Sequence, residues 1–447
     1  MRRLPRCAER CLHCLVTAVC LIVVAGCGGG SAEPSGLQER LAALDRPSIV
    51  LLLVDTLRSD LLEPYGFQQE TSPELARWAE QGVLFERVLA QSSWTKVSMA
   101  SLLTSLWPRS HGVRLSTDGL GEGALTLAEV LGAAGYATYA VQTNGWLEQS
   151  FGFQQGFEQY SFSRGNDAKR RMPGASLWAH ADRVLEEAVA RMDELDSGRP
   201  FFLYLHFMDV HEYAAPPELR TFGTDQRGFY LASIRWTDDA IRRVREHLER
   251  RGLLDDTVLM VASDHGEAFG ENQAHGHAFN VNSPVLRVPL ILRLPFAIEP
   301  RRVPTQVRNV DIAPTLLEIA GVPVPDAFEG ESLLPLLRDG AELADRPNFA
   351  SLPAHIMKTG RLQVAVNDGS WTLVRELDEQ GREYLYDQAI DPREDANIID
   401  LEPEVAARMR EMLDAHQAVE ARAGTSQQDV RIDPAIAERL RAVGYLQ

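Results

Sequence analysis

Cysteine is almost missing from this chain of 447 residues. There are five cysteines, and all of them lie within the first 27 residues. If that segment is removed or modified on export, as its pattern below predicts, no thiol remains to form a disulfide. Thiol catalysis and cysteine-ligated zinc sites are therefore excluded.

Positive charge is also in short supply. The chain has 45 Lys and Arg against 63 Asp and Glu, a net charge of −18. Removing residues 1–26 takes away four Arg and one Glu, which leaves 41 basic and 62 acidic residues and a net charge of −21. Such a surface repels nucleic acid and anionic headgroups, so nucleic acid is excluded as a partner. An anionic substrate would need a local positive site, which a metal ion could supply.

The apolar run near the N-terminus, Leu15 to Ala25, is too short to span a membrane. Four arginines precede it, and a basic segment followed by a short apolar one is typical of a secretory signal. Val24-Ala25-Gly26-Cys27 resembles the lipobox of bacterial lipoproteins, which implies cleavage before Cys27 and a lipid on its sulfur. The alternative is an ordinary signal peptide with an incidental Cys27. We expect a signal peptide at 1–26, a tether at 27–45, and a lipoprotein anchored to a bacterial membrane, facing the periplasm or the exterior.

Strand-like apolar runs alternate with helical patterns along most of the chain. This alternation predicts an α/β fold, with a mostly parallel sheet covered by helices on both faces. After Leu337 the segments become shorter and alternate in polarity, which predicts a small antiparallel sheet followed by a helix from Glu404. We therefore expect a catalytic domain at 46–340 and a C-terminal subdomain and tail at 341–447. The expected strands are 48–54, 137–141, 201–207, 258–261 and 290–294, and the expected helices are 37–44, 182–195, 238–251 and 404–423.

Two of the expected strands end in acidic residues. Asp55 follows the run 48–54, and Asp264-His265 follows the run 257–261. Open α/β sheets bind ligands at the carboxyl ends of their strands, so these side chains predict one shared metal site. A strand-end Asp also caps helices, which is the alternative for Asp55 taken alone. Oxygen and nitrogen donors without sulfur suit Ca²⁺, Mg²⁺, Mn²⁺ or Zn²⁺ and do not choose among them.

A run of small polar residues, 92–98, leads into a helix-like apolar pattern. A hydroxyl at a helix N-terminus gains from the positive end of the dipole, which stabilises an alkoxide or an incoming anion. Thr95 and Ser98 equally fit simple helix capping.

Together these motifs resemble the sulfatase family of the alkaline phosphatase superfamily. Seven blocks occur in the family's order over roughly residues 46–340, and they include Ser263-Asp264-His265-Gly266-Glu267 and Gly276-His277. The other blocks are 54–60, 100–104, 111–113, 287–291 and 310–316. The resemblance implies an alkaline phosphatase-like α/β/α sandwich and assigns Asp55, Asp264 and His265 as metal ligands.

The nucleophile position departs from the family pattern. Sulfatases carry Cys or Ser in C/S-x-P-x-R, which is oxidised to formylglycine. The alignment places Thr95, Val97 and Met99 at the three fixed positions, so no formylglycine is expected. Thr serves as nucleophile and metal ligand in several phosphate-handling relatives, and we assign Thr95 both roles. Phe279 stands where sulfatases carry a substrate-binding Lys, which also weakens the case for sulfate.

Further candidate residues surround this set. His211 and His277 are expected to donate a proton or stabilise charge, while Arg58, Lys96 and His206 are expected to bind the substrate. The alternatives are a structural pair with Asp60 for Arg58, a solvated Lys96 and a hydrogen-bonded core histidine for His206. One divalent metal ion is favoured. A second ion held by Asp209, His211 and His277 is a minor alternative.

The favoured function is a lipid-anchored, metal-dependent hydrolase that cleaves sulfate or phosphate esters through Thr95. One alternative is a phosphodiesterase, or a transferase of the phosphoethanolamine or phosphoglycerol type. A second is a non-catalytic binding module. The departures from the family motif favour this alternative, whereas the presence of Asp55, Thr95, Asp264 and His265 argues against it.

Overall fold

The computed structural model describes residues 36–163, 181–195, 198–338, 344–353, 361–419 and 428–430. The expected signal peptide at 1–26 and residues 27–35 of the tether, Cys27 among them, lie outside these residues. No helix in the described ranges is both long and apolar enough to cross a membrane.

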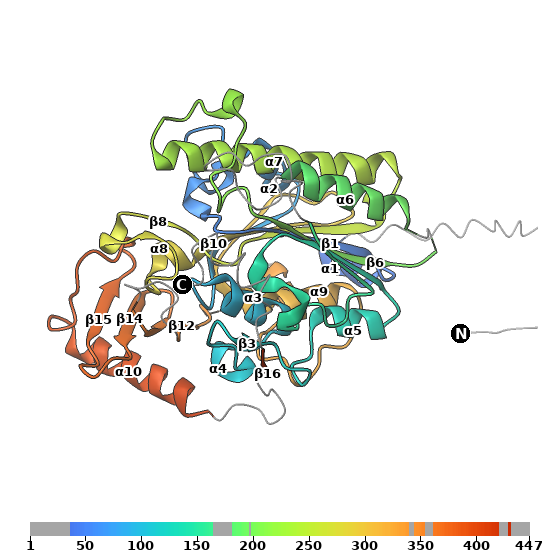
Figure 1. Ribbon diagram of the computed structural model, residues 1–447. Coiled ribbons are helices and arrows are strands. Elements are labelled where there is room, and N and C mark those ends of the chain that lie inside the picture. The colour runs from blue at the N-terminus through green and yellow to red at the C-terminus, as the bar shows by residue number, and fades with distance from the viewer. Residues whose placement is uncertain are drawn as a thin grey trace, which may run out of the picture.

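A twisted sheet, with eight strands in the described part of the chain, forms the centre of the molecule (Figure 1). The strand order is β11-β2-β10-β7-β1-β6-β4-β5. Every neighbouring pair is parallel except the two that β10 makes with β2 and β7. The strands are β1 (Ser48–Val54), β2 (Val83–Leu89), β4 (Ala137–Gln142), β5 (Gln159–Phe162), β6 (Phe201–Phe207), β7 (Thr257–Ala262), β10 (Arg287–Arg293) and β11 (Arg301–Arg308).

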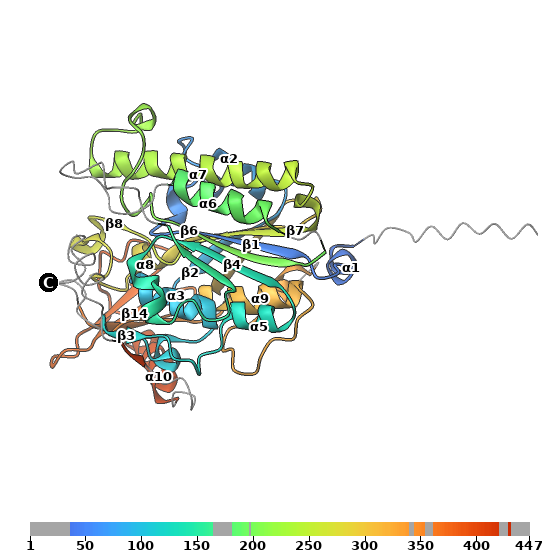
Figure 2. The same cartoon turned by 45° about the vertical axis from the view of Figure 1, so that its right-hand side comes forward.

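Helices cover both faces of this sheet (Figure 2). Because side chains alternate along a strand, the odd residues of β1 pack on one face and the even residues on the other. One face is covered by α3 (Thr95–Thr104), α5 (Leu127–Ala133) and α9 (Ile312–Ile319), and the other by α2 (Pro73–Ala79), α6 (Ala181–Asp193) and α7 (Gln226–Arg250). The predicted α/β sandwich is confirmed.

A smaller antiparallel sheet packs beside the central one, as the sequence predicted. Its order is β12-β13-β14-β15, and α10 (Pro403–Ala418) covers one face through Ala406, Met409 and Leu413. The four strands are β12 (Asn348–Leu352), β13 (Gln363–Asn367), β14 (Trp371–Glu376) and β15 (Glu383–Asp387). The remaining α-helices and strands of the described residues are α1 (Leu37–Ala42), α4 (Pro108–His111), α8 (Ser283–Leu286) and the short pairs β3 (Asp118–Gly119) with β16 (Gln428–Asp429) and β8 (Ala268–Phe269) with β9 (His275–Gly276).

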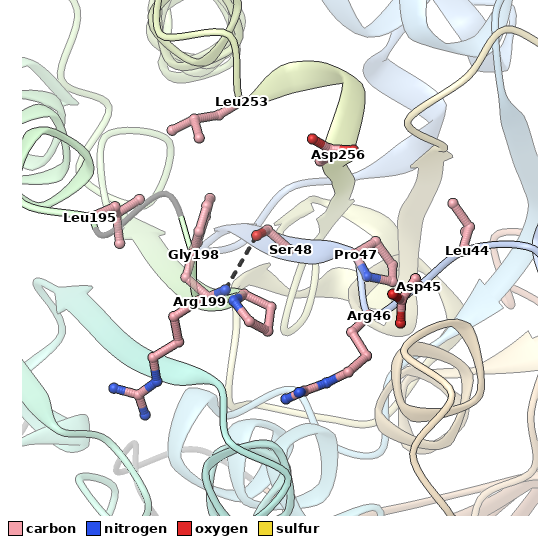
Figure 3. A pocket seen from close by; sticks show the side chains of 12 residues that line it. Leu44, Asp45, Arg46, Pro47, Ser48, Leu195, Gly198, Arg199, Leu253 and Asp256 are labelled. Atoms are coloured by element: carbon pink, nitrogen blue, oxygen red, sulfur yellow. Dashed lines mark hydrogen bonds between the residues drawn. The ribbon is translucent and has the colours of Figure 1, made fainter.

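The two ends of the central sheet differ. A pocket at the end of the sheet where β1 and β6 begin is lined by Ser48, Phe201, Arg46 and Arg199 among others (Figure 3). None of the residues that the sequence assigned to the site lines it. Helix α1 lies at this same end of the sheet (Figure 2). The assigned residues lie at the opposite end of the sheet, at the carboxyl ends of β1 and β7.

Candidate active site and metal centre

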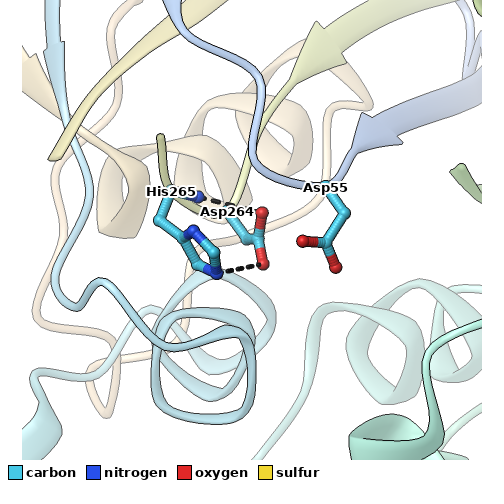
Figure 4. Close-up of side chains that lie close together, drawn as sticks. All are labelled: Asp55, Asp264 and His265. Atoms are coloured by element: carbon cyan, nitrogen blue, oxygen red, sulfur yellow. Dashed lines mark hydrogen bonds and ion pairs between the residues drawn. The ribbon is translucent and has the colours of Figure 1, made fainter. Parts of the chain in front are cut away.

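Asp55, Asp264 and His265 come together as the sequence predicted. Strands β1 and β7 are parallel neighbours, so Asp55 and Asp264 emerge side by side from their ends. One ligand atom from each of the three residues lies within 4.8 Å of the other two (Figure 4). All three side chains are fully buried.

Each carboxylate uses one oxygen and leaves the other without a donor. Oδ1 of Asp264 accepts the backbone N–H groups of Thr56, at 3.2 Å, and of His265, at 2.9 Å. Oδ2 of Asp55 accepts the side chains of Asn144 and His206. Oδ1 of Asp55 and Oδ2 of Asp264 have no hydrogen-bond partner in the described structure. Buried carboxylate oxygens without donors are costly unless a cation binds them.

The orientation of His265 completes this set of donors. Its Nδ1 lies 3.0 Å from the carbonyl oxygen of Gly266, which can only accept, so Nδ1 carries the proton. In the neutral ring Nε2 is then an acceptor, and it faces Oδ2 of Asp264 at 3.3 Å. Two acceptors pointed at each other across this distance fit a cation held between them.

The electrostatics of the three groups agree with that interpretation. Burial, and then the charge of His277, lower the pKa of His265 to about 3, so the ring is neutral. Burial and the nearby charge of Asp55 raise the pKa of Asp264. Burial alone would raise the pKa of Asp55, but the His206 hydrogen bond and the neighbouring histidines hold it well below its usual value. Two carboxylates and a neutral imidazole fit a divalent cation.

Thr95 is the first residue of α3 and faces the same centre. Its Oγ1 lies 3.2 Å from Nε2 of His265. The alternative role in helix capping is absent, because the helix begins after Trp94 without a side-chain cap, and Ser98 instead donates to the carbonyl of Asp264. An uncapped helix N-terminus favours an anion, so the hydroxyl stands where an anionic group would bind.

His211 and His277 lie beside the expected metal ligands, with their rings tilted. The His277 ring centroid lies 4.7 Å from that of His265 and 4.8 Å from that of His211. Glu212 holds Nδ1 of His211 at 3.1 Å, and Glu267 holds Nδ1 of His277 at 3.0 Å.

The pKa of His211 favours a charged ring. Burial alone would lower this pKa, but the Glu212 hydrogen bond and the charges of Asp55, Glu212 and Glu267 raise it to about 9. His211 is therefore a protonated group at neutral pH, able to bind an anion or donate a proton.

The structure does not support the substrate-binding assignments of His206, Arg58 and Lys96. His206 is fully buried, because both faces of strand β6 are covered, and its ring is bonded to Asp55 and Tyr204. The guanidinium of Arg58 is buried and bonded to Asp60 and Glu271, so the structural alternative holds.

Lys96 is buried rather than solvated. Its Nζ donates to the carbonyl of Ser116 at 2.8 Å and lies 3.5 Å from the Phe151 ring centroid. Burial lowers its pKa well below the usual value. A side chain so enclosed is not placed to contact a substrate.

The described residues do not form the second metal site of the alternative with Asp209, His211 and His277. Within the described residues, the group around Asp55 is the one set of three such donors at this spacing. Asp209 accepts the backbone N–H of Ala181, while His211 and His277 bind their own glutamates.

Sequence reasoning missed four residues that support the site. Asn144 and Tyr204 belong to the hydrogen bonds around Asp55, and Glu212 and Glu267 hold the two histidines. Asn144 lies just past the end of β4, so the strand-end rule that found Asp55 would have found it too.

Comparisons with known proteins identify the class. The sulfatase family model matches residues 47–322, and the model for the C-terminal part of N-sulphoglucosamine sulphohydrolase matches residues 275–419. The chain belongs to the sulfatase family of the alkaline phosphatase superfamily, and it is a hydrolase of ester bonds as predicted.

Individual relatives are distant but match over three quarters or more of each chain. Human N-acetylgalactosamine-6-sulfatase is 27% identical over 77% of this chain and 76% of its own. The N-acetylglucosamine-6-O-sulfatase of Bacteroides thetaiotaomicron is 22% identical over 86% and 90%.

Solved structures share the fold. One in complex with its substrate D-glucosamine-2-N,6-O-disulfate has a TM-score of 0.69 at 19% identity and covers 83% of this chain and 98% of its own. The phosphonate monoester hydrolase of Agrobacterium radiobacter has a TM-score of 0.68 at 20% identity, covering 87% and 99%.

Proposed function

We propose that the protein is a metal-dependent hydrolase that cleaves an anionic ester through Thr95. One observation carries the proposal: the Thr95 hydroxyl stands at an uncapped helix N-terminus, 3.2 Å from Nε2 of His265. Asp55, Asp264, His265 and Thr95 would hold one divalent ion. That ion would lower the pKa of the Thr95 hydroxyl and draw the anionic ester into an otherwise acidic protein.

The chain's own residues then provide a balanced reaction. Oγ1 of Thr95 loses its proton to solvent and forms a bond to phosphorus or sulfur, while the bond to the leaving oxygen breaks. His211 or His277 donates the proton that the leaving oxygen needs. Water next attacks the esterified Thr95, which releases the inorganic anion and restores the hydroxyl.

Phosphate and sulfate esters both fit this chemistry. The sulfatases among the relatives support a sulfate ester. Thr95 favours a phosphate ester, since its side chain cannot become formylglycine, and the likeness to a phosphonate monoester hydrolase is compatible with that choice. A transferase that passes a phosphoryl group to an alcohol acceptor would use the same first step. The binding module is disfavoured, because the hydroxyl and the three metal ligands converge at one point.

We also propose that the protein is exported and anchored through a lipid on Cys27. Helix α1 and the start of β1 lie at the end of the sheet opposite the site (Figure 2). An anchor attached before α1 would therefore leave the proposed active site on the side of the protein that faces away from the membrane.

Parallel assays test the catalytic proposal. Aryl sulfate, aryl phosphate monoester and phosphodiester would each be offered to the wild type, Thr95→Ala and Thr95→Ser, with Mn²⁺, Zn²⁺, Ca²⁺ or Mg²⁺. Thr95→Ala should lose roughly 10²-fold or more in kcat on the preferred ester, while Thr95→Ser keeps a hydroxyl and much of the rate. Retention of more than a few per cent of turnover by Thr95→Ala would exclude Thr95 as the nucleophile.

A further inference from the structure

Two side chains fix the carboxylate of Asp55 from behind. Its Oδ2 accepts Nδ2 of Asn144 at 2.8 Å and Nε2 of His206 at 3.0 Å. Its Oδ1 accepts nothing in the described structure, and the carboxylate contributes one oxygen to the cluster with Asp264 and His265. Both donors therefore occupy Oδ2, which leaves Oδ1 available to the proposed metal.

The amide of Asn144 has only one orientation that satisfies its neighbours. Its Oδ1 accepts the backbone N–H of Trp146 at 2.9 Å, capping the short turn Gly145–Leu147 after β4. A backbone N–H can only donate, so the oxygen must lie on that side and the NH₂ group on the side of Asp55. Asn144 is fully buried, so water does not compete for this bond.

His206 supplies the second donor from the next strand. Strand β6 pairs in parallel with β1, with His206 opposite Leu53. Its Nδ1 lies 2.6 Å from the Tyr204 hydroxyl, which can donate to it, and Nε2–H then points to Asp55. Donors of this kind behind a metal-binding carboxylate fix its orientation and raise metal affinity.

We propose that Asn144, assisted by His206, is a positioning residue that holds Asp55 in the orientation a divalent metal requires. The inference rests on the proposed metal-dependent function and deepens it. Asn144 links the loop after β4 to the ligand on β1, so the metal site depends on strands β1, β4 and β6 as well as β7.

Metal affinity tests the inference directly. The variant Asn144→Ser keeps an oxygen able to cap Trp146 but is too short to reach Asp55. We expect its Kd for Mn²⁺, measured by titration calorimetry on the metal-free protein, to rise about 10- to 100-fold. The matched control is Thr126→Ala, which removes the cap of α5 without touching the site and should leave the Kd unchanged. An Asn144→Ser protein that melts like the control yet binds Mn²⁺ within about threefold of the wild type would overturn the inference.

A second pair of variants covers the case in which Asn144→Ser does not fold. His206→Gln keeps an N–H donor near Asp55 and should bind Mn²⁺ nearly as tightly as the wild type, whereas His206→Leu should lose about tenfold or more. Equal affinity for the two would contradict the positioning role. Asp55→Asn separates this from the proposed function: if it binds Mn²⁺ as well as the wild type, the metal site itself is wrong and both proposals fall.

Discussion

The hydrogen bond between His211 and Glu212 gives a prediction about how kcat/KM depends on pH. His211 carries a proton up to about pH 9, because its bond to Glu212 and the nearby carboxylates outweigh the effect of burial. If the protonated ring assists catalysis, kcat/KM should fall as the pH rises through about 9. Glu212→Gln replaces the carboxylate by a neutral amide of the same shape. This change should lower the pKa of His211 and move the alkaline limb to lower pH.

The expected shift in the pKa of His211 follows from the free energy of its hydrogen bond to Glu212. A hydrogen bond to a charged partner contributes about 1.5–3 kcal/mol, and one pKa unit corresponds to about 1.4 kcal/mol. The limb should therefore move down by roughly one to two units. The assay is kcat/KM from pH 5 to 11 with the best aryl ester. Glu158→Gln, which disrupts an exposed pair with Arg199 far from the site, is the control. If the limb stays within about 0.3 units of the wild type in Glu212→Gln, His211 does not set it.

Three further predictions concern metal, stability and anchoring. Mn²⁺ at 100 times its Kd should stabilise the fold by about 2.7 kcal/mol in the wild type and much less in Asp264→Asn, as thermal melting with and without chelator can show. Arg58→Met leaves Glu271 buried without its partner and should cost about 3–5 kcal/mol in urea unfolding with little change in KM; a large KM effect in a stable protein would restore Arg58 as a substrate contact. Cys27→Ser should move the protein from the membrane fraction to the soluble fraction of the producing bacterium, and unchanged fractionation would argue against the lipid.

The sequence was sufficient for the centre of the site because strand ends are visible in it. Asp55 and Asp264 each follow an apolar run, and parallel neighbours place their ends together, so their meeting required only the fold class. The start of helix α7 was missed by twelve residues, since Phe229 to Trp236 is nearly all apolar and lacks a helical period. The antiparallel direction of β10 was equally invisible, because a buried strand has the same pattern in either direction.

The supporting residues could not be assigned without the strand order. His206 was interpreted as a substrate contact because it lies near the end of β6, but only the pairing of β6 with β1 turns its ring to Asp55. Arg58 and Lys96 show a related limit. Their charges are plain in the sequence, whereas Glu271 and the carbonyl of Ser116, which bind them, come from distant or irregular segments.

The unpaired carboxylate oxygens connect the chemistry of the site to the stability of the fold. A buried polar atom without a partner costs about 1–3 kcal/mol, so Oδ1 of Asp55 and Oδ2 of Asp264 together cost about 2–6 kcal/mol in the metal-free protein. This is a large part of the 5–15 kcal/mol that typically keeps a domain folded. The surrounding donors prevent either carboxylate from turning away, since Asp55 is held by Asn144 and His206 and Asp264 by two backbone N–H groups. The fold thus maintains an arrangement that is unfavourable without a cation, and a bound cation would offset that cost at the place where the proposed reaction activates the Thr95 hydroxyl.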